Sequence, residues 1–127
     1  LLDAVIATGK PVVVLLAAGS ALSVAQGNAI LLTWYPGQAG GTAAAKLLFG
    51  EASPSGRLPV TFYHNVDELP PFEDYAMANR TYRYFDGKPL YPFGYGLSYT
   101  HFVYSDATYE NGAVSVCLRN AGEYASD

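Results

Sequence analysis

The sequence is poor in the residues that build disulfide frameworks, metal clusters and nucleic-acid-binding faces. It has one cysteine, and its two histidines, His64 and His101, lie far apart along the chain. Local spacing therefore supports neither a disulfide pair nor a set of zinc ligands. Only seven Lys and Arg are present, scattered singly, and the net charge is −4. We therefore expect no metal site. Because no basic face can follow a phosphate backbone, we also expect no nucleic-acid partner.

Long apolar runs and export signals are also lacking. The longest apolar run, Pro11 to Ala18, is too short to span a bilayer. The first residues show no charged segment followed by a small-residue cleavage site. We therefore expect no membrane partner, and the sequence does not indicate a compartment.

The first half of the chain alternates between strand-like and helix-like segments. The stretch 12–18 is continuously apolar, which is typical of a parallel strand that is covered on both faces, and 29–35 is a second strand-like run. The stretch 42–50, "TAAAKLLFG", has helical composition and ends in glycine. A shorter apolar stretch, 58–63, contains Pro59, which limits it to a sheet edge or a strand end. This alternation predicts an α/β fold with a parallel sheet.

The second half has a different character. Residues 66–87 are polar, aromatic and without a sustained period, which predicts a long surface loop. The stretch 90–102, "LYPFGYGLSYTHF", crowds Tyr and Phe between glycines and a proline. Two alternating runs then flank Asn111-Gly112, which predicts an antiparallel hairpin. Cys117 alternates with polar neighbours in the second run, and we expect its thiol to be buried and unreactive.

Three blocks of the sequence, in this order, resemble a known enzyme family. They are "GKPVVVLLAAGSAL", "WYPGQAGGTAAAKLLFGEASPSGRLPVTF" and "PLYPFGYGLSYTHF". Together they are similar to the C-terminal part of glycoside hydrolase family 3, the β-glucosidases and β-xylosidases. The stretch "YAMANRTYRYFDGKPLYPFGYG" is more similar to the β-xylosidase branch.

The resemblance implies a domain arrangement. Such enzymes have a barrel domain, an α/β sandwich domain and often a fibronectin type III-like β-sandwich. Residues 1–100 would then be the C-terminal portion of the α/β sandwich domain, and residues 101–127 the first strands of an incomplete antiparallel β-sandwich. The expected partners are the upstream barrel domain, the remainder of the β-sandwich and a β-linked oligosaccharide.

The resemblance also implies a chemistry, which is retaining hydrolysis by two carboxylates. In the family both carboxylates precede the matched region, so we expect the nucleophile and the acid/base upstream of Leu1 and no catalytic residue in this chain. No cofactor is implied, and the family is compatible with a periplasmic or extracellular location. The chain alone is expected to be inactive; the alternative is a non-catalytic carbohydrate-binding or structural module of the same architecture.

One cluster in the long loop has the chemistry to contact sugar. Arg80 and Arg83 flank Tyr82, and together they offer planar donors and a flat ring. We interpret these three residues as candidate substrate-binding residues. The competing interpretation is that they pack the loop onto its own domain. The acidic pair Glu73-Asp74 is interpreted as solvated loop residues rather than a catalytic pair.

The aromatic stretch 90–102 is expected to serve packing rather than chemistry. Because it lies at the predicted domain boundary, its rings would be buried between two domains and hold their orientation. Two strands of a sandwich and an incomplete parallel sheet leave open edges, so the chain reads as part of a longer polypeptide that is prone to self-association when isolated.

Overall fold

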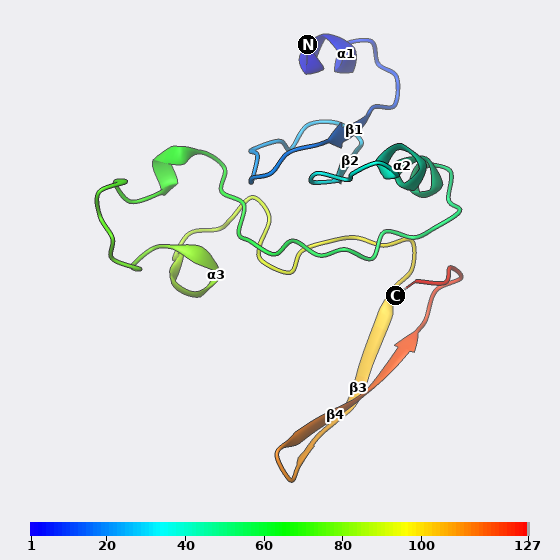
Figure 1. Ribbon diagram of the computed structural model, residues 1–127, viewed down its shortest axis with the longest axis vertical. Helices are drawn as coiled ribbons and strands as arrows, with labels where there is room; N and C mark the ends of the chain where they lie inside the picture. The colour runs from blue at the N-terminus through cyan, green and yellow to red at the C-terminus, as the bar shows by residue number, and fades with distance from the viewer. Residues whose placement is uncertain (127) are drawn as a thin grey trace. The chain divides into compact units, whose positions relative to one another are not determined.

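The computed structural model describes residues 1–126 and contains two separate two-stranded sheets. The chain divides into two compact units. The first comprises residues 1–44 and 58–95, and the second comprises residues 45–57 and those from Gly96 onward. The elements in chain order are α1 (Leu2–Ile6), β1 (Val13–Leu16), β2 (Ala29–Leu32), α2 (Gly40–Leu48), the 3₁₀ turn η1 (Val66–Glu68), α3 (Thr81–Tyr84), β3 (Phe102–Glu110) and β4 (Ala113–Asn120), shown in Figure 1.

The first unit contains the expected parallel pair, β1 with β2. Val13 lies opposite Ala29, and the register runs without a break to Leu16 opposite Leu32. The predicted parallel sheet is therefore confirmed, although both strands are shorter than the apolar stretches. Trp34 has a φ of 52°, a left-handed conformation that a strand cannot continue through.

One face of β1 is less covered than the sequence predicts. The strand alternates between exposed and half-buried positions, and Val13 and Leu15 are 51% and 50% exposed. The expectation of a strand buried on both faces is therefore wrong for the chain as described. Because residues 12–18 are all apolar, the exposed face of β1 that carries Val13 and Leu15 is apolar too.

Helix α2 begins two residues earlier than the alanine-rich stretch. Gly40 lies in its first turn and is buried, and a Cβ added there would approach Cγ of Pro36 to 2.5 Å. Of the three consecutive alanines, Ala44 is buried at 6% exposure. The helix is followed by Gly50 with a φ of 76°, so the predicted glycine stop is confirmed.

The centre of the first unit is Phe62, which is 3% exposed. Its ring meets Trp34 edge-on at 6.4 Å and Tyr91 edge-on at 6.1 Å. Its backbone pairs with Tyr91 in an isolated antiparallel bridge, with N–H···O distances of 2.9 and 3.2 Å. Two further bonds join Leu58 to Tyr95 and Gly94. The stretch 58–63 is thus paired at Leu58 and Phe62 and bends at residues 59 and 60, in keeping with the limit that Pro59 sets.

The stretch 66–87 is more ordered than a structureless loop. It contains η1 and α3, so the expectation of a loop without regular elements is wrong in this detail. Asn65 caps η1 by accepting the N–H of Asp67 at 2.8 Å. The Asn65 side chain here takes the place of a backbone acceptor, as Asn and Asp side chains commonly do in short turns.

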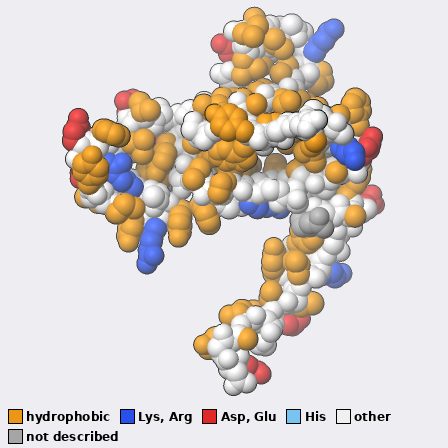
Figure 2. Space-filling view, viewed as in Figure 1, with side chains coloured by type: hydrophobic (Ala, Val, Ile, Leu, Met, Phe, Trp, Pro, Cys, Tyr) orange, Lys and Arg blue, Asp and Glu red, His pale blue; other side chains and the backbone are white. Residues whose placement is uncertain are grey.

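The second unit contains the predicted antiparallel hairpin. Strands β3 and β4 pair from Phe102–Asn120 to Glu110–Ala113, with Asn111 and Gly112 at φ values of 51° and 79° in the turn. Every position of β4 is exposed, and hydrophobic side chains lie open on the hairpin surface (Figure 2). Cys117 is exposed with them, so the expectation of a buried thiol is wrong for this chain.

Tyr99 anchors the start of the hairpin within the second unit. Its N–H donates to Oγ of Ser53 at 2.9 Å, and its hydroxyl donates to the Leu47 carbonyl at 2.7 Å. Its ring meets Tyr124 edge-on at 6.0 Å. Gly96 allows the chain to approach closely, because a Cβ there would lie 2.6 Å from the Gly56 carbonyl oxygen.

Candidate functional site

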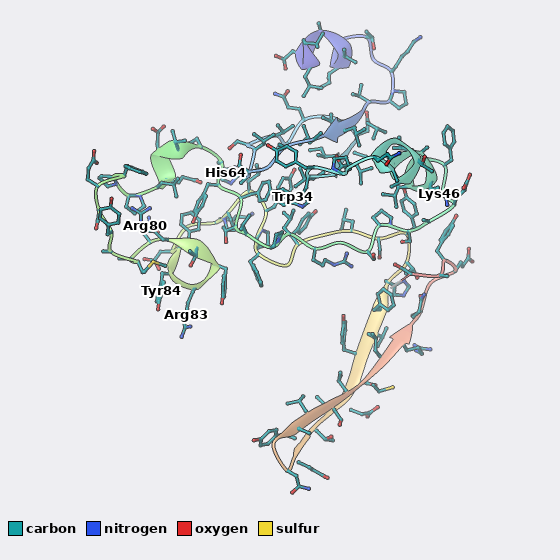
Figure 3. The ribbon with its side chains drawn as sticks, in the orientation of Figure 1. Trp34, Lys46, His64, Arg80, Arg83 and Tyr84 are labelled. Carbon is teal, nitrogen blue, oxygen red and sulfur yellow. The ribbon has the colours of Figure 1, made fainter. Side chains whose placement is uncertain are left out.

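The loop 71–80 is organised around one side chain, Arg80. Its Nε donates to the carbonyl of Ala76 at 3.1 Å, and one terminal nitrogen donates to the carbonyls of Pro71 at 3.0 Å and Asp74 at 2.6 Å. Arg80 is half-buried, and Figure 3 places it inside the curve of the loop. The guanidinium fork therefore orders three backbone carbonyls that the loop would otherwise leave to water.

Asn79 completes the frame at the base of this loop. It has a φ of 54°, and its amide donates to the Glu68 carbonyl at 3.4 Å while its Oδ1 accepts the N–H of Asp86 at 3.1 Å. The backbone N–H of Thr81 donates to the hydroxyl of Tyr63 at 2.9 Å. Asn suits this position, because it tolerates the left-handed conformation better than most residues and both atoms of its side-chain amide are hydrogen-bonded.

Tyr82 and Arg83 lie on α3 and remain open. Tyr82 is 64% exposed, and its ring stacks on Phe93 at 4.6 Å and 26°. Arg83 is exposed, and its guanidinium lies 5.8 Å from the ring centre of Tyr84 (Figure 3). The sequence placed Arg80, Tyr82 and Arg83 in one cluster, whereas the structure turns Arg80 into the loop and leaves the other two on the surface.

A cavity of about 330 Å³ lies beside Tyr82. Its walls are rings and prolines together with Thr61, whose buried Oγ1 has no hydrogen-bond partner. The cavity is neutral, because no charged side chain lines it. Its lining residues are Thr61, Tyr82, Phe85, Pro89, Pro92 and Phe93. Sequence reasoning missed the contribution of Thr61 and the prolines, whose separation along the chain gives no local signal.

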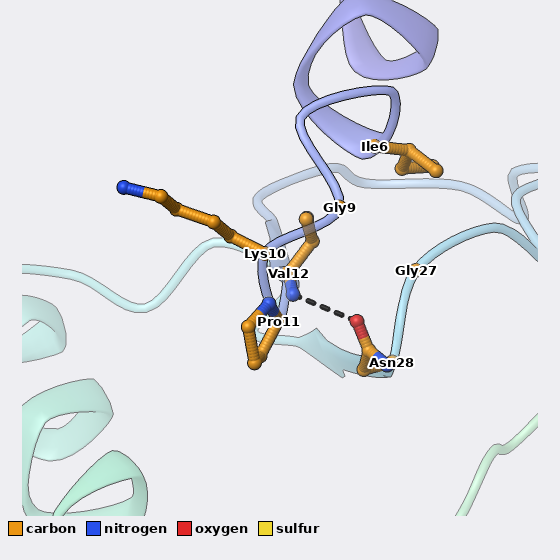
Figure 4. A pocket seen from close by; sticks show the side chains of 7 residues that line it. All are labelled: Ile6, Gly9, Lys10, Pro11, Val12, Gly27 and Asn28. Atoms are coloured by element: carbon orange, nitrogen blue, oxygen red, sulfur yellow. Dashed lines mark hydrogen bonds between the residues drawn. The ribbon is translucent and has the colours of Figure 1, made fainter.

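A second cavity, of about 390 Å³, lies between the end of α1 and the start of β2 (Figure 4). Asn28 closes one wall by accepting the N–H of Val12 at 2.8 Å. The other lining residues are Ile6, Gly9, Lys10, Pro11 and Gly27. Because Lys10 is the single charged residue in this lining, the cavity offers no pair of groups for acid/base chemistry.

Tyr91 connects the aromatic stretch to the first unit. Its hydroxyl donates to the Val24 carbonyl at 3.2 Å, and its ring stacks on Tyr95 at 5.2 Å and 26°. Burial raises the pKa of Tyr91 above its ordinary value of 10.0, and the nearby Tyr95 raises it further. At neutral pH Tyr91 is a packing and hydrogen-bonding group, and the raised pKa extends its neutral form to higher pH.

The acidic residues of the loop serve its backbone. Glu68 accepts the N–H of His64 at 2.8 Å, and Asp74 accepts the N–H of Ala76 at 2.9 Å. Across residues 1–126, no group of three His, Cys, Asp or Glu side chains is placed to hold a metal ion. In the same residues, no helix has the length and hydrophobicity needed to cross a membrane.

Comparison with known proteins gives a consistent result. A model of the glycosyl hydrolase family 3 C-terminal domain matches residues 1–99. The chain is 51% identical over 113 residues to a xylan 1,4-β-xylosidase of Xylanibacter ruminicola, covering 86% of this chain and 13% of that protein. It is 44% identical over 124 residues to a periplasmic β-glucosidase of Salmonella typhimurium, covering 85% of this chain and 16% of that protein.

Solved structures agree with these relatives. The β-glucosidase 3B of Thermotoga neapolitana, in complex with α-D-glucose, superposes with a TM-score of 0.77 and 36% identity, covering 95% of this chain and 20% of that one. An exo-β-xylosidase bound to a xylobiose aziridine probe superposes with a TM-score of 0.73 and 34% identity, covering 83% of this chain and 16% of that one. The chain thus spans between 13% and 20% of the length of these four proteins.

Proposed function

The chain belongs to glycosyl hydrolase family 3, matching its C-terminal domain, and we propose that it is part of a retaining β-glycosidase that removes terminal β-linked xylose or glucose from oligosaccharides. The observation that carries the proposal is the match over residues 1–99 together with 51% identity to a xylan 1,4-β-xylosidase. Both β-xylosidases and β-glucosidases are among the relatives, so the proposal includes both sugars.

In this proposal the chain contributes framework and not the reacting groups. Retaining hydrolysis needs two carboxyl groups about 5 to 5.5 Å apart, one to attack the anomeric carbon and one to protonate the leaving oxygen. Glu68 and Asp74 are engaged with backbone N–H groups of their own loop. As the family resemblance implies, we place the nucleophile and the acid/base in the part of the full-length protein that precedes Leu1.

We also propose a domain assignment for two stretches of the chain, which differ in their bounds from the two compact units because residues 45–57 belong to the second unit. Residues 1–100, with the parallel pair and α2, would be the end of an α/β sandwich domain. Residues 101–127 would open a fibronectin type III-like β-sandwich, a fold of about seven strands. The exposed apolar side chains of Val114, Val116 and Leu118 support this assignment, because they alternate along β4 and a sandwich strand packs one face on a partner sheet.

A hydrolysis assay with the full-length protein tests this function directly. We expect it to hydrolyse aryl β-xylosides or aryl β-glucosides and to release the sugar with retained configuration, as measured by NMR of the first product formed. A protein that bound oligosaccharides without cleaving them would instead be the non-catalytic module. Inverted product would contradict the retaining mechanism.

Substrate contact through Tyr82 and Arg83 is a second part of the proposal. Both side chains are exposed on α3, and Tyr82 lines the neutral cavity. We expect Tyr82→Ala and Arg83→Ala in the full-length enzyme to raise KM by about three- to tenfold while the melting temperature stays within a degree or two. Lys88→Ala, which removes another exposed cation, is the matched control. A lowered melting temperature with unchanged KM would assign both residues to packing.

A further inference from the structure

The loop held by Arg80 displays two aromatic side chains that its own frame does not use. Phe72 and Tyr75 are each 87% exposed. Among the described residues, neither ring forms an aromatic pair, in contrast to Tyr82 on the neighbouring helix. Large exposed rings are typical of surfaces that contact a ligand or another part of a protein.

The backbone beneath these rings is tied at both sides. The N–H of Asp74 donates to the Pro71 carbonyl at 3.0 Å, and its carboxylate accepts the N–H of Ala76 at 2.9 Å. Arg80 holds the carbonyls of Pro71, Asp74 and Ala76 from the inner side. The loop is therefore ordered before any ligand binds, which lowers the entropic cost of contact.

The charge of the loop restricts the ligand. Glu73 and Asp74 lie in sequence between the two rings, and Figure 2 shows basic as well as acidic and hydrophobic side chains at this end of the surface. The two carboxylates and the Arg80 guanidinium, which is turned to the loop carbonyls, leave the loop with a small net negative charge that does not favour an anionic partner. They accept hydrogen bonds from hydroxyl groups, while ring faces pack against the C–H faces of a pyranose. Rings beside carboxylates thus fit a neutral polyhydroxylated chain.

We propose that Phe72 and Tyr75, on the loop ordered by Arg80, form an accessory contact surface for sugar residues of a β-linked oligosaccharide beyond the one that is cleaved. This inference rests on the proposed function, because it concerns which part of the same substrate the enzyme holds. Arg80 is a positioning residue for this surface, because it orders the loop that carries the two rings. The surface favours longer substrates over aryl monosaccharides.

The test compares long and short substrates in the full-length enzyme. We expect Phe72→Ala and Tyr75→Ala to lower the ratio of kcat/KM for xylo- or cello-oligosaccharides of six residues to that for the aryl monosaccharide by about three- to tenfold. Tyr75→Phe, which keeps the ring, should preserve the ratio. Val66→Ala, an exposed apolar residue on η1, is the matched control and should leave the ratio unchanged.

Arg80 provides an independent readout. Arg80→Lys keeps the charge but loses the planar fork, so amide hydrogen exchange in residues 72–78 should speed up and the substrate ratio should fall as in the alanine variants. An unchanged ratio in Phe72→Ala and Tyr75→Ala would overturn the proposal. So would an equal loss on both substrates with a lowered melting temperature, because the rings would then pack inside the complete enzyme.

Hydrolysis assays of the parent enzyme test the proposed function, and binding measurements test the surface separately. If the parent enzyme cleaves no glycoside, the proposed function is wrong. The surface is then tested by calorimetric titration of the full-length protein with xylohexaose and cellohexaose. Weaker binding in Phe72→Ala and Tyr75→Ala supports the surface, and equal affinity or no binding by the parent overturns it.

Discussion

At the scale of single residues, Tyr91 combines ring packing with a hydrogen bond and a raised pKa. It packs against Phe62 and Tyr95 and donates to the Val24 carbonyl. Tyr91→Phe keeps the ring and removes this bond, so we expect a loss of about 0.5–1.5 kcal/mol in the free energy of unfolding. The melting temperature of the full-length protein and its Tyr91→Phe variant, at neutral pH, measures this.

The raised pKa of Tyr91 adds a pH dependence with a definite sign. The folded state holds the neutral phenol above pH 10, where the unfolded chain begins to lose the proton. The stabilisation is therefore complete below pH 10 and declines as the pH rises beyond it. Tyr91→Phe should flatten this decline, and an equally steep decline in the variant would contradict the assignment.

The candidate site shows what a sequence reveals about individual residues. The sequence indicates that Arg80, Tyr82 and Arg83 lie close together, because they are neighbours in the chain. It cannot show which donors are free, because this depends on the path of residues 71–76 past the Arg80 guanidinium. The role of the two arginines in sugar binding stays a prediction.

At the scale of elements, the start of α2 provides a matched pair of glycines. A Cβ at Gly40 would approach Cγ of Pro36 to 2.5 Å, whereas a Cβ at Gly41 would meet nothing within 4 Å. We expect Gly40→Ala to destabilise by about 1–3 kcal/mol, because a proline ring cannot move aside easily. Gly41→Ala should stabilise by about 0.5–1 kcal/mol through helix propensity and reduced freedom of the unfolded chain.

Thermal unfolding of the two glycine variants in the full-length protein measures this contrast. Because both residues lie in the first turn of the same helix, differences in propensity cancel between them. Equal shifts in melting temperature for the two variants would show that Pro36 does not constrain the helix start.

The elements that the sequence predicts well are those with local signals. The hairpin follows from Asn111-Gly112 between alternating runs, and the end of α2 follows from Gly50. The strand ends were missed, because β2 stops before a left-handed Trp34 that no local pattern announces. The helical turns within residues 66–87 were missed because four residues are too few to show a period.

At the scale of the whole molecule, the described residues expose more apolar side chains on their strands than a folded soluble domain usually does. Side chains on β1 and throughout β4 are exposed, although their spacing is that of covered strands. The sequence predicts this pattern of apolar residues but not its coverage, because coverage depends on segments outside the strands themselves. The packing of the ring-rich stretch 90–102 between two domains stays a prediction, and the ring pairs of Tyr91 and Tyr99 are each formed within one unit.

The claim that this chain is framework without the reacting carboxylates is tested most directly by one assay. Purified polypeptide of residues 1–127 and the full-length protein are incubated in parallel with aryl β-xyloside and aryl β-glucoside, and the released aryl alcohol is measured. We predict turnover by the full-length protein and release at the uncatalysed rate with the 127-residue chain. Turnover by the isolated chain would contradict the account, because it would place a working nucleophile and proton donor among these residues.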